Sequence, residues 1–325
     1  MTRSVLITGG AGFIGSNLAA ALVAARDRVR IVDDLSIGRL AYLDGVSYEL
    51  VQRSLADRDA ITDAVRGVDA VVHLAARAGI PDSVADPIGT FEANAGWTLA
   101  LLDAARLAGV RRFVFASSNA AAGDHQPPAS ELDLPHPVSP YGASKLAGEA
   151  YCQAYAGSFG MAACALRFSN VFGPRSLHKK SVVAAWLRAA LAGAPIAIHG
   201  DGQQTRDFVH VDDLAAAVQA ALEAPEETVA GELFQAGTGV ETTINELAAA
   251  VEDAMGRRLE IVRLPARAGD VRRNVSRVDK AAERLGYRAR VTLRDGIDHT
   301  AAWFRTALAD PELVAIAPHS ASGSE

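Results

Sequence analysis

The sequence predicts an α/β fold in which a doubly wound parallel Rossmann sheet carries a smaller, irregular α/β substrate lobe. Three observations support this prediction. Short apolar runs alternate with helical patterns through the first half of the 325 residues, a glycine-rich turn follows the first run, and the alternation ends after Asn170. Strand–helix alternation with short connections is typical of parallel sheets that helices cover on both faces.

Each expected element follows from its residues. The predicted strands are uninterrupted apolar runs rich in β-branched or aromatic residues: Val5–Thr8, Val29–Val32, Tyr48–Val51, Ala70–Leu74, Phe113–Ala116 and Ala162–Phe168. Helical patterns lie between them at Ile14–Ala25, Asp57–Val65, Thr90–Leu107 and Tyr141–Ser158. Later in the chain we expect helices at Val182–Leu191 and Ile244–Met255, the second behind the capping-box pair Thr243 and Glu246.

The order of these elements predicts two structural units. We expect a dinucleotide-binding domain over residues 1–170, with returns to the sheet near 208–236. A ligand-binding lobe would take residues 171–207 and 237–312 and lie at the carboxyl ends of the strands, where open α/β sheets bind ligands. Residues 313–325 are expected to form a flexible tail.

Composition excludes several classes of protein. Half of the residues are apolar and 22% are charged, with 32 Lys and Arg against 38 Asp and Glu, a formal net charge of −6. A net acidic chain without a basic block argues against a nucleic-acid binder. We also expect no membrane span and no secretion signal. Cys152 and Cys164 form neither a disulfide framework nor a metal set, so we expect no metal and a cytoplasmic location.

A glycine motif follows the first predicted strand. Gly9 would allow a tight turn, Gly12 would let a pyrophosphate approach the backbone, and Gly15 would let the next helix pack closely on the sheet. The second strand ends at Asp33, whose carboxylate would accept hydrogen bonds from an adenosine ribose and repel a 2′-phosphate. This pattern predicts NAD rather than NADP. The alternative is that Asp33 only caps a turn.

A second group of residues has the character of an acid–base site. Tyr141 and Lys145 lie four residues apart at the start of a predicted helix, so their side chains share one face. The Lys145 ammonium would lower the pKa of Tyr141, and Ser118, at a strand end, would orient a substrate hydroxyl. Together they would move a proton while a nicotinamide takes a hydride from the same carbon. A chance Tyr/Lys pair on an exposed helix is the alternative.

These segments resemble the extended short-chain dehydrogenase/reductase family, and within it the NAD-dependent nucleotide-sugar epimerases and dehydratases of the UDP-glucose 4-epimerase type. The matching segments stand in family order: Thr8–Gly15, Asp33–Ser36, His73–Ala76, Asn94, Ser117–Ser118, Tyr141 with Lys145, Arg167–Arg175 and Gly200–Asp213. The resemblance covers nearly the whole chain.

The resemblance implies NAD as cofactor and a nucleotide-diphosphate sugar as substrate. It implies cofactor contacts from Gly9, Gly12, Phe13, Ile14, Gly15, Asp33, Asp34, Ser36, Leu55, Leu74, Ala75, Ala76, Asn94, Ser117, Tyr141 and Lys145. It implies substrate contacts from Ser118, Asn170, Arg206, Arg267, Asp270 and Asn274. Tyr141 would be the base and Lys145 its partner, and the two arginines would grip the diphosphate, a role that suits a planar guanidinium. A surface ion pair is the alternative for either arginine.

Three positions concern the sugar pocket. Ala122 stands where the family often has an aromatic residue, so one wall of the pocket would be missing. Asn274 falls where 4-epimerases limit the sugar's C2 substituent, and its small size would admit an N-acetyl group. The segment His178–Lys180 would either approach a diphosphate or sugar carboxylate or form a solvated loop, and we favour the loop.

The reaction we expect is 4-epimerisation of a nucleotide-diphosphate sugar, with UDP-sugars first. Dehydration needs an acid and a base after the catalytic hydroxyl, and Asn119-Ala120 follows Ser118 here. Decarboxylation of UDP-glucuronate stays open, as does a simple alcohol or steroid dehydrogenase. A non-catalytic NAD-binding sensor is a further alternative, although it would be expected to lack Tyr141 or Lys145. The family also implies a homodimer formed by helices near Thr90–Leu107 and Tyr141–Ser158.

Overall fold

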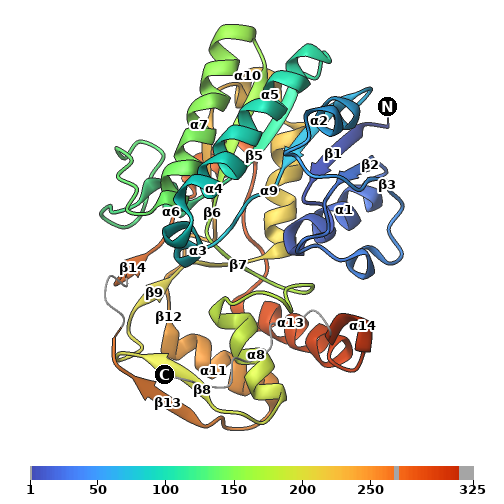
Figure 1. Ribbon diagram of the computed structural model, residues 1–325. Helices are drawn as coiled ribbons and strands as arrows, with labels where there is room; N and C mark the ends of the chain where they lie inside the picture. The colour runs from blue at the N-terminus through green and yellow to red at the C-terminus, as the bar shows by residue number, and fades with distance from the viewer. Residues whose placement is uncertain (1, 267–270, 315–325) are drawn as a thin grey trace.

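A seven-stranded, all-parallel sheet organises the molecule (Figure 1). The structure, a computed structural model, describes residues 2–266 and 271–314. In spatial order the strands are β11 (Leu233–Ala236), β6 (Ala162–Phe168), β5 (Arg112–Ser118), β4 (Ala70–His73), β1 (Ser4–Thr8), β2 (Arg28–Val32) and β3 (Glu49–Val51). The strand order reverses between β1 and β4: from β1 the chain adds β2 and β3 on one side, and from β4 it adds β5, β6 and β11 on the other, as in a doubly wound sheet. The expected fold class is therefore confirmed.

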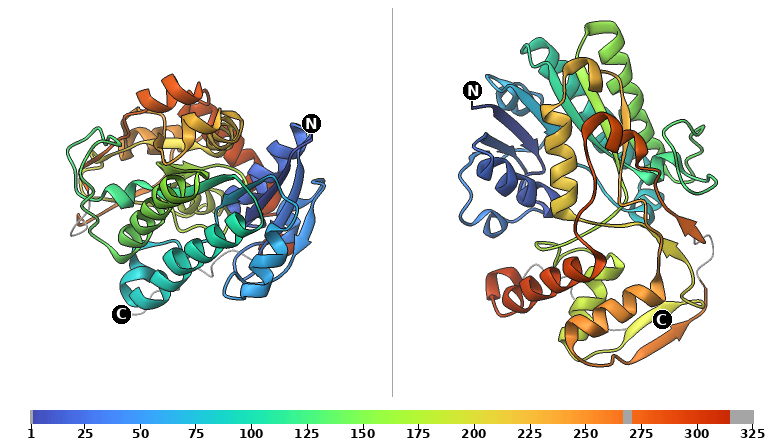
Figure 2. Two further views of the ribbon diagram at one scale, coloured as in Figure 1. Left: turned by 90° about the horizontal axis from the view of Figure 1, so that it is seen from above. Right: turned by 180° about the vertical axis from the view of Figure 1, so that it is seen from behind.

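Helices cover both faces of this sheet. One face packs against α1 (Phe13–Ala24), α9 (Val211–Glu223) and α12 (Asp279–Leu285), and the other against α2 (Arg58–Val65), α5 (Trp97–Leu107) and α7 (Pro140–Phe159). Figure 2 shows α9 beside α1 in the view from behind. Short elements connect these layers: η1 (Leu40–Leu43), α3 (Ile80–Ala85), α4 (Pro87–Phe91), the π-helical η2 (Glu92–Gly96), α6 (Asn119–Ala122) and α10 (Glu226–Val229).

A third hydrophobic cluster lies below the sheet in Figure 1. It is built on α8 (Val182–Leu191), α11 (Ile244–Met255) and α13 (Leu293–Ala307), followed by α14 (Pro311–Val314). The short strands form separate small sheets: β7 (Asn170–Phe172) pairs with β10 (Phe208–His210), β9 (Thr205–Arg206) lies between β12 (Thr242–Thr243) and β14 (Arg273–Asn274), and β8 (Ile196–His199) pairs with β13 (Ile261–Leu264). The expected capping box at Thr243 and Glu246 is present at the start of α11.

One predicted helix contains an irregular turn. The segment Thr90–Leu107 is helical throughout, as predicted, but α4 passes through the π-helical turn η2 before α5 begins at Trp97. Asp86 caps α4 through its carboxylate, and Pro87 occupies the first helical position. A π-turn shifts the side chains that follow it, and here it brings Asn94 against the backbone of Arg77.

Candidate active site

A cleft of roughly 840 Å³ lies at the carboxyl ends of the sheet strands. Most of the residues expected to bind a ligand line it: Gly9, Gly12, Phe13, Ile14, Gly15, Asp33, Asp34, Ser36, Leu55, Leu74, Ala75, Ala76, Ser117, Ser118, Tyr141, Lys145, Asn170 and Arg206. Asn94 and Asn274 do not line it. Arg267 and Asp270 lie outside the described residues. The cleft therefore brings together residues from strands, helices and loops far apart in the chain.

The glycine turn after β1 leaves no room for side chains. Gly9 has a φ of +66°, and a Cβ there would lie 3.0 Å from the backbone of Ala75. A Cβ on Gly15 would lie 2.2 Å from the Gly9 carbonyl oxygen. Gly10 was given no role from its spacing, yet a Cβ there would lie 2.6 Å from the Ile31 side chain. The turn is a bare backbone cradle, which fits the pyrophosphate of a dinucleotide.

The first turn of α1 faces this cradle. Gly12 is the N-cap residue of α1, and no side chain caps the helix there in the described structure. The first N–H groups of a helix carry a partial positive charge and need acceptors. Phosphate oxygens would supply those acceptors, so the residues present fit a bound NAD.

Asp33 connects the end of β2 to the glycine turn. One of its carboxylate oxygens accepts a hydrogen bond from the backbone N–H of Ala11 (2.9 Å), and the other accepts one from Leu35 (2.9 Å). Burial raises the pKa of Asp33, and these two hydrogen bonds oppose the rise. Each oxygen keeps a further lone pair for a ligand hydroxyl. The next carboxylate, Asp34, accepts hydrogen bonds from both the N–H and the hydroxyl of Ser36.

A buried chain of hydrogen bonds holds the cleft wall after β4. The Thr8 hydroxyl accepts hydrogen bonds from the N–H groups of Leu74 (3.1 Å) and Ala75 (3.0 Å), so its proton goes to His73 Nδ1 (2.7 Å). His73 Nε2 then donates to the Thr98 hydroxyl (2.9 Å), which donates to the Asn94 carbonyl (2.5 Å). The contacts assign a neutral, Nε2-protonated imidazole to His73. Its position at a strand end was the only signal for this role in the sequence.

Asn94 supports the cleft from behind. Its side chain is 1% exposed, accepts a hydrogen bond from the Arg77 N–H (2.8 Å) and donates to the Arg77 carbonyl and the Ser144 hydroxyl. The expectation that it contacts the cofactor is therefore replaced by a positioning role. Asn94 holds the loop whose Ala75 and Ala76 line the cleft.

Tyr141, Ser118 and Lys145 meet in the cleft. The groups that shift the pKa of Tyr141 there differ from the one we expected. The pKa of Tyr141 is raised by burial, and only the hydrogen bond with Ser118 opposes that rise. Lys145 Nζ donates to the Ala116 carbonyl (2.8 Å) and lies over the Phe115 ring. Burial lowers the pKa of Lys145 to about 8, against the charge of Glu149. Lys145 is therefore not among the groups that shift the pKa of Tyr141 in this structure, and a lowering of that pKa by Lys145 stays a prediction.

A buried ion pair lies one helical turn beyond Lys145. Glu149 accepts hydrogen bonds from Arg167 Nε (2.8 Å) and Nη2 (2.7 Å), and the two side chains are 4% and 1% exposed. The Ser117 hydroxyl donates to the same carboxylate (2.5 Å). The pair thus connects α7 to the ends of β5 and β6. Spacing alone did not indicate it, because Arg167 comes from a distant strand.

Polar residues from the short strands β7 and β9 face the same strand ends. Asn170 and Arg206 line the cleft, and Arg206 Nη1 donates to the carbonyls of Thr205 and Val271 (2.7 Å each). Asn274 pairs with Arg206 across β14 and β9, and its side-chain oxygen accepts a hydrogen bond from Asn119 (3.3 Å). Asn274 therefore lies behind Arg206, outside the cleft lining.

Asp207 organises this region. It is 0% exposed and accepts hydrogen bonds from Ser169, Ser276, Gly239 and both donors of Thr238. These donors come from three separate segments, so a single carboxylate joins them. Such a buried charge is stable because backbone and hydroxyl donors satisfy it.

One of the expectations about the sugar pocket needs correction. His178 and Lys179 line the cleft, so the solvated loop that we favoured for His178–Lys180 is wrong for these two residues, while Lys180 is exposed. The Tyr42 ring stacks on His178, with centroids 6.0 Å apart, and burial lowers the pKa of His178 to about 4. Ala122 is 1% exposed and does not line the cleft, so it contributes no wall to the pocket, and the missing wall stays a prediction.

Comparisons with known proteins agree with this architecture. A model of the NAD dependent epimerase/dehydratase family matches residues 5–237. The UDP-glucose 4-epimerase of Mycolicibacterium smegmatis is 40% identical over 313 residues, which cover 92% of this chain and 98% of the relative. Relatives described as a nucleotide-sugar decarboxylase and as dTDP-glucose 4,6-dehydratases also match most of the chain.

Solved structures are similar as well. The UDP-glucose 4-epimerase of Thermotoga maritima, solved with UDP-glucose, superposes with a TM-score of 0.88 at 35% identity, covering 94% of this chain and 99% of that one. The UDP-glucose 4-epimerase of Thermus thermophilus, solved with NAD, gives a TM-score of 0.85 at 36% identity, with the same coverage.

Proposed function

This chain belongs to the NAD-dependent epimerase/dehydratase family, with NAD as its cofactor, and we propose that it is a nucleotide-sugar 4-epimerase acting on UDP-sugars. One observation supports this most: Tyr141, Ser118 and Lys145 share a cleft with the glycine cradle and with Arg206. The first three residues suit proton transfer at a hydroxyl. The arginine suits a diphosphate, which a simple alcohol substrate would not carry.

The chain's own residues would carry out the proton chemistry. NAD, when bound, supplies a hydride acceptor and donor at its nicotinamide ring. Tyr141 Oη, as phenolate, takes the proton of the sugar's C4 hydroxyl, and the Ser118 hydroxyl orients that oxygen. After the sugar has turned, Tyr141 returns the proton to the C4 oxygen. The Ser118 hydrogen bond favours the phenolate, and the Lys145 ammonium would do so once substrate excludes water.

Asn119 favours epimerisation over dehydration. Its side chain does not line the cleft, and its amide donates to the hydroxyls of Ser169 and Ser276 and to Asn274. An amide neither gives nor takes a proton at neutral pH. Elimination of water across C5 and C6 would therefore lack an acid and base at this position.

We assign the diphosphate to Arg206 and, by resemblance, to Arg267, with Asp270 and Asn274 beside them. Arg206 is tied by two backbone carbonyls and so presents a preorganised guanidinium. Lys179 lines the same cleft as Arg206 and adds a second cation to the part that we assign to the substrate. Asn274 contacts Asn119, and neither residue lines the cleft, so an effect of Asn274 on sugar size stays a prediction.

A panel of UDP-glucose, UDP-galactose, UDP-N-acetylglucosamine and UDP-glucuronate, followed by chromatography, tests the proposal. We expect interconversion of 4-epimers, and a loss of at least about 100-fold in kcat for Tyr141→Phe. Tyr155→Phe is the matched control, because Tyr155 lies on the same helix with its hydroxyl on Asp103. Inactivity on the whole panel would refute the proposal that the protein is an enzyme acting on UDP-sugars. Release of CO₂ with a UDP-pentose identifies a decarboxylase instead, and full activity of Tyr141→Phe refutes the mechanism.

We also propose that the protein is a homodimer. Apolar side chains on α3 and α4, which pack against α7, are largely exposed: Val84 (64%), Ile88 (69%) and Phe91 (59%). Ala143 and Ala150 are exposed on α7 itself, where small side chains permit close helix packing. Light scattering should give about twice 34.0 kDa for the wild type and a monomer for Phe91→Glu. A monomeric wild type would refute the dimer.

A further inference from the structure

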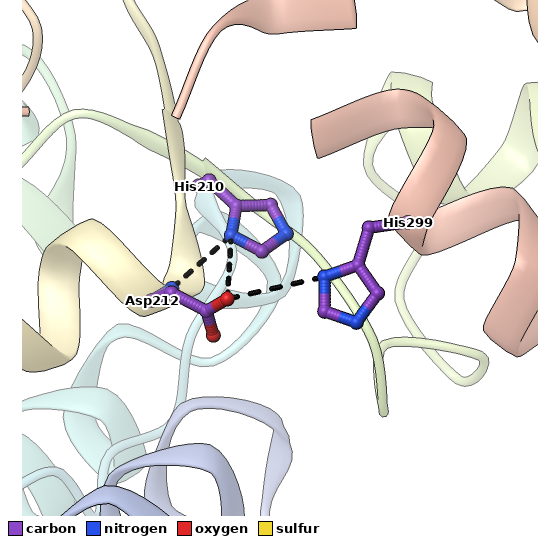
Figure 3. A group of neighbouring side chains, drawn as sticks. All are labelled: His210, Asp212 and His299. Carbon is purple, nitrogen blue, oxygen red and sulfur yellow. Dashed lines mark hydrogen bonds and ion pairs between the residues drawn. The ribbon is translucent and has the colours of Figure 1, made fainter. Parts of the chain in front are cut away.

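Two histidines and an aspartate converge outside the cleft, where β10 meets α9 and α13 (Figure 3). His210 ends β10, Asp212 lies in the first turn of α9, and His299 lies in the middle of α13. One potential ligand atom from each residue lies within 4.8 Å of the other two. The proposed epimerase chemistry uses none of these side chains.

The contacts within this group place acceptor atoms face to face. His210 Nδ1 lies 3.4 Å from Asp212 Oδ2, and His299 Nδ1 lies 3.9 Å from the same oxygen. The Asp212 backbone N–H donates to His210 Nδ1 (3.3 Å), so this nitrogen carries no proton, its lone pair accepts that hydrogen bond, and the proton of the neutral ring is on Nε2. A cation bound between His210 Nδ1 and Asp212 Oδ2 would take the place of this long hydrogen bond.

His210 carries a second sign of incomplete satisfaction. Its side chain is fully buried, and Nε2 has no hydrogen-bond partner among the described residues. Its ring is already fixed, because it packs on Phe172 (centroids 5.4 Å apart) and against Gly296 of α13. A rigid imidazole whose Nδ1 faces a carboxylate is prepared to bind a cation.

We propose that His210, Asp212 and His299 form a binding site for a divalent transition-metal ion, with zinc the best match. Zinc ligands lie about 2.0–2.1 Å from the metal, so tetrahedral ligand atoms are about 3.3 Å apart. The 3.4 Å between His210 Nδ1 and Asp212 Oδ2 is already close to this value. A small rotation of His299 would shorten the 3.9 Å between its Nδ1 and the same oxygen. Imidazole nitrogens favour zinc, nickel and copper over calcium or magnesium, which take oxygen ligands.

The surroundings allow the adjustment and complete the coordination. Asp212 and His299 are each 55% exposed, so both side chains can move and water can fill the fourth position. Besides the histidines, Arg175 acts on the charge of Asp212, and its Nη1 donates to the Ser16 carbonyl (2.8 Å). Arg175 weakens the site without occupying it.

The position of the ion determines its effect. Helix α9 belongs to the cluster that packs on the sheet, whereas α13 belongs to the third cluster below it. A metal bound by Asp212 and His299 would clamp these two helices together. Phe208, at the other end of β10, lines the cleft. The ion would therefore act on the stability of the fold and on the position of the third hydrophobic cluster relative to the sheet.

Untagged protein, stripped with a chelator, tests the site. We expect saturable one-to-one Zn²⁺ binding by calorimetry, and a Co²⁺ complex with intense visible absorption typical of a tetrahedral site. Zn²⁺ should raise the midpoint of thermal unfolding. His299→Ala should weaken Zn²⁺ binding at least about tenfold and abolish the thermal shift, because it removes a ligand.

His136→Ala is the matched control, since His136 is exposed on a loop away from this group. It should bind Zn²⁺ as the wild type does. His299 is on the surface, so its loss should leave the fold intact, which circular dichroism checks. Absence of saturable binding by the wild type would overturn the site, as would equal affinity in wild type and His299→Ala.

Discussion

At the glycine turn, single atoms decide whether a dinucleotide fits. A Cβ on Gly15 would lie 2.2 Å from the Gly9 carbonyl, so Gly15→Ala must displace the cradle. We predict that this variant binds NAD at least about tenfold more weakly, a loss of about 1.4 kcal/mol. Calorimetry measures the effect. Gly157→Ala is the matched control: Gly157 is also helical and has no atom within 4 Å of an added Cβ. Equal NAD affinity in both variants would contradict the cradle.

The buried imidazole of His73 makes a distinct contribution to acid stability. Burial, and secondarily the Lys145 charge, lower its pKa from 6.5 to about 3. Between these pH values His73 is protonated in the unfolded chain but not in the folded chain. The free energy of unfolding should therefore fall as pH falls, by up to about 1.4 kcal/mol per pH unit from this residue.

Urea denaturation between pH 6.5 and 4 measures this slope. We predict a flatter pH dependence for His73→Gln than for the wild type, whatever its stability at neutral pH. His136→Gln, at an exposed position, should keep the wild-type slope. Identical slopes in all three proteins would show that His73 takes up a proton in the folded state.

Residue roles differ in how far the sequence reveals them. The glycines, Asp33, Tyr141, Lys145 and Ser118 stand at fixed spacings around predicted strands and helices, and the structure places them all in the cleft. Roles that depend on distant partners could not be predicted. Asn94 accepts a hydrogen bond from the Arg77 N–H behind the cleft lining. The pKa of Tyr141 depends on burial, which the spacing of residues in the sequence does not show.

At the scale of elements, α7 connects the catalytic face to a buried ion pair. Tyr141, Lys145 and Glu149 follow one another at intervals of four, and Glu149 binds Arg167 of β6. We predict that Glu149→Gln lowers the free energy of unfolding by about 3–5 kcal/mol, because it leaves a buried guanidinium without its counter-charge. Urea denaturation measures this loss.

Two further variants separate charge loss from repacking. Glu149→Leu with Arg167→Met removes both charges and should recover most of the stability. Glu226→Gln breaks the exposed pair with Arg111 and should unfold close to the wild-type midpoint. If Glu149→Gln and Glu226→Gln have the same midpoint, the buried pair contributes nothing measurable.

Elements with strong local signals were predictable, and those shaped by tertiary contacts were not. Helix α7 begins behind the Ser139 cap with Pro140 in its first turn and ends at Gly160, within about two residues of its predicted bounds. The predicted helix Thr90–Leu107 is helical throughout, but it contains the π-helical turn η2 between α4 and α5. That turn puts Asn94 on Arg77, a tertiary contact that no helical periodicity encodes.

For the whole molecule, the cleft is lined both by the parallel sheet and by segments that lead into the third hydrophobic cluster. The glycine cradle and Tyr141 come from the sheet side, whereas Arg206, His178 and Lys179 come from segments that continue into the third cluster. A net charge of −6 gave no sign of this local gathering of cations. Among the described residues, no helix is long and apolar enough to cross a membrane.

The fate of the C4 hydrogen of the sugar tests the central claim most directly. Purified protein would be incubated with UDP-galactose that carries deuterium at C4, in ordinary water, and the product analysed by mass spectrometry and NMR. We predict UDP-glucose that retains the deuterium at C4, because the hydrogen leaves and returns to one carbon inside the closed cleft. A product that has exchanged this deuterium for solvent hydrogen, or that has lost water or CO₂, would contradict 4-epimerisation.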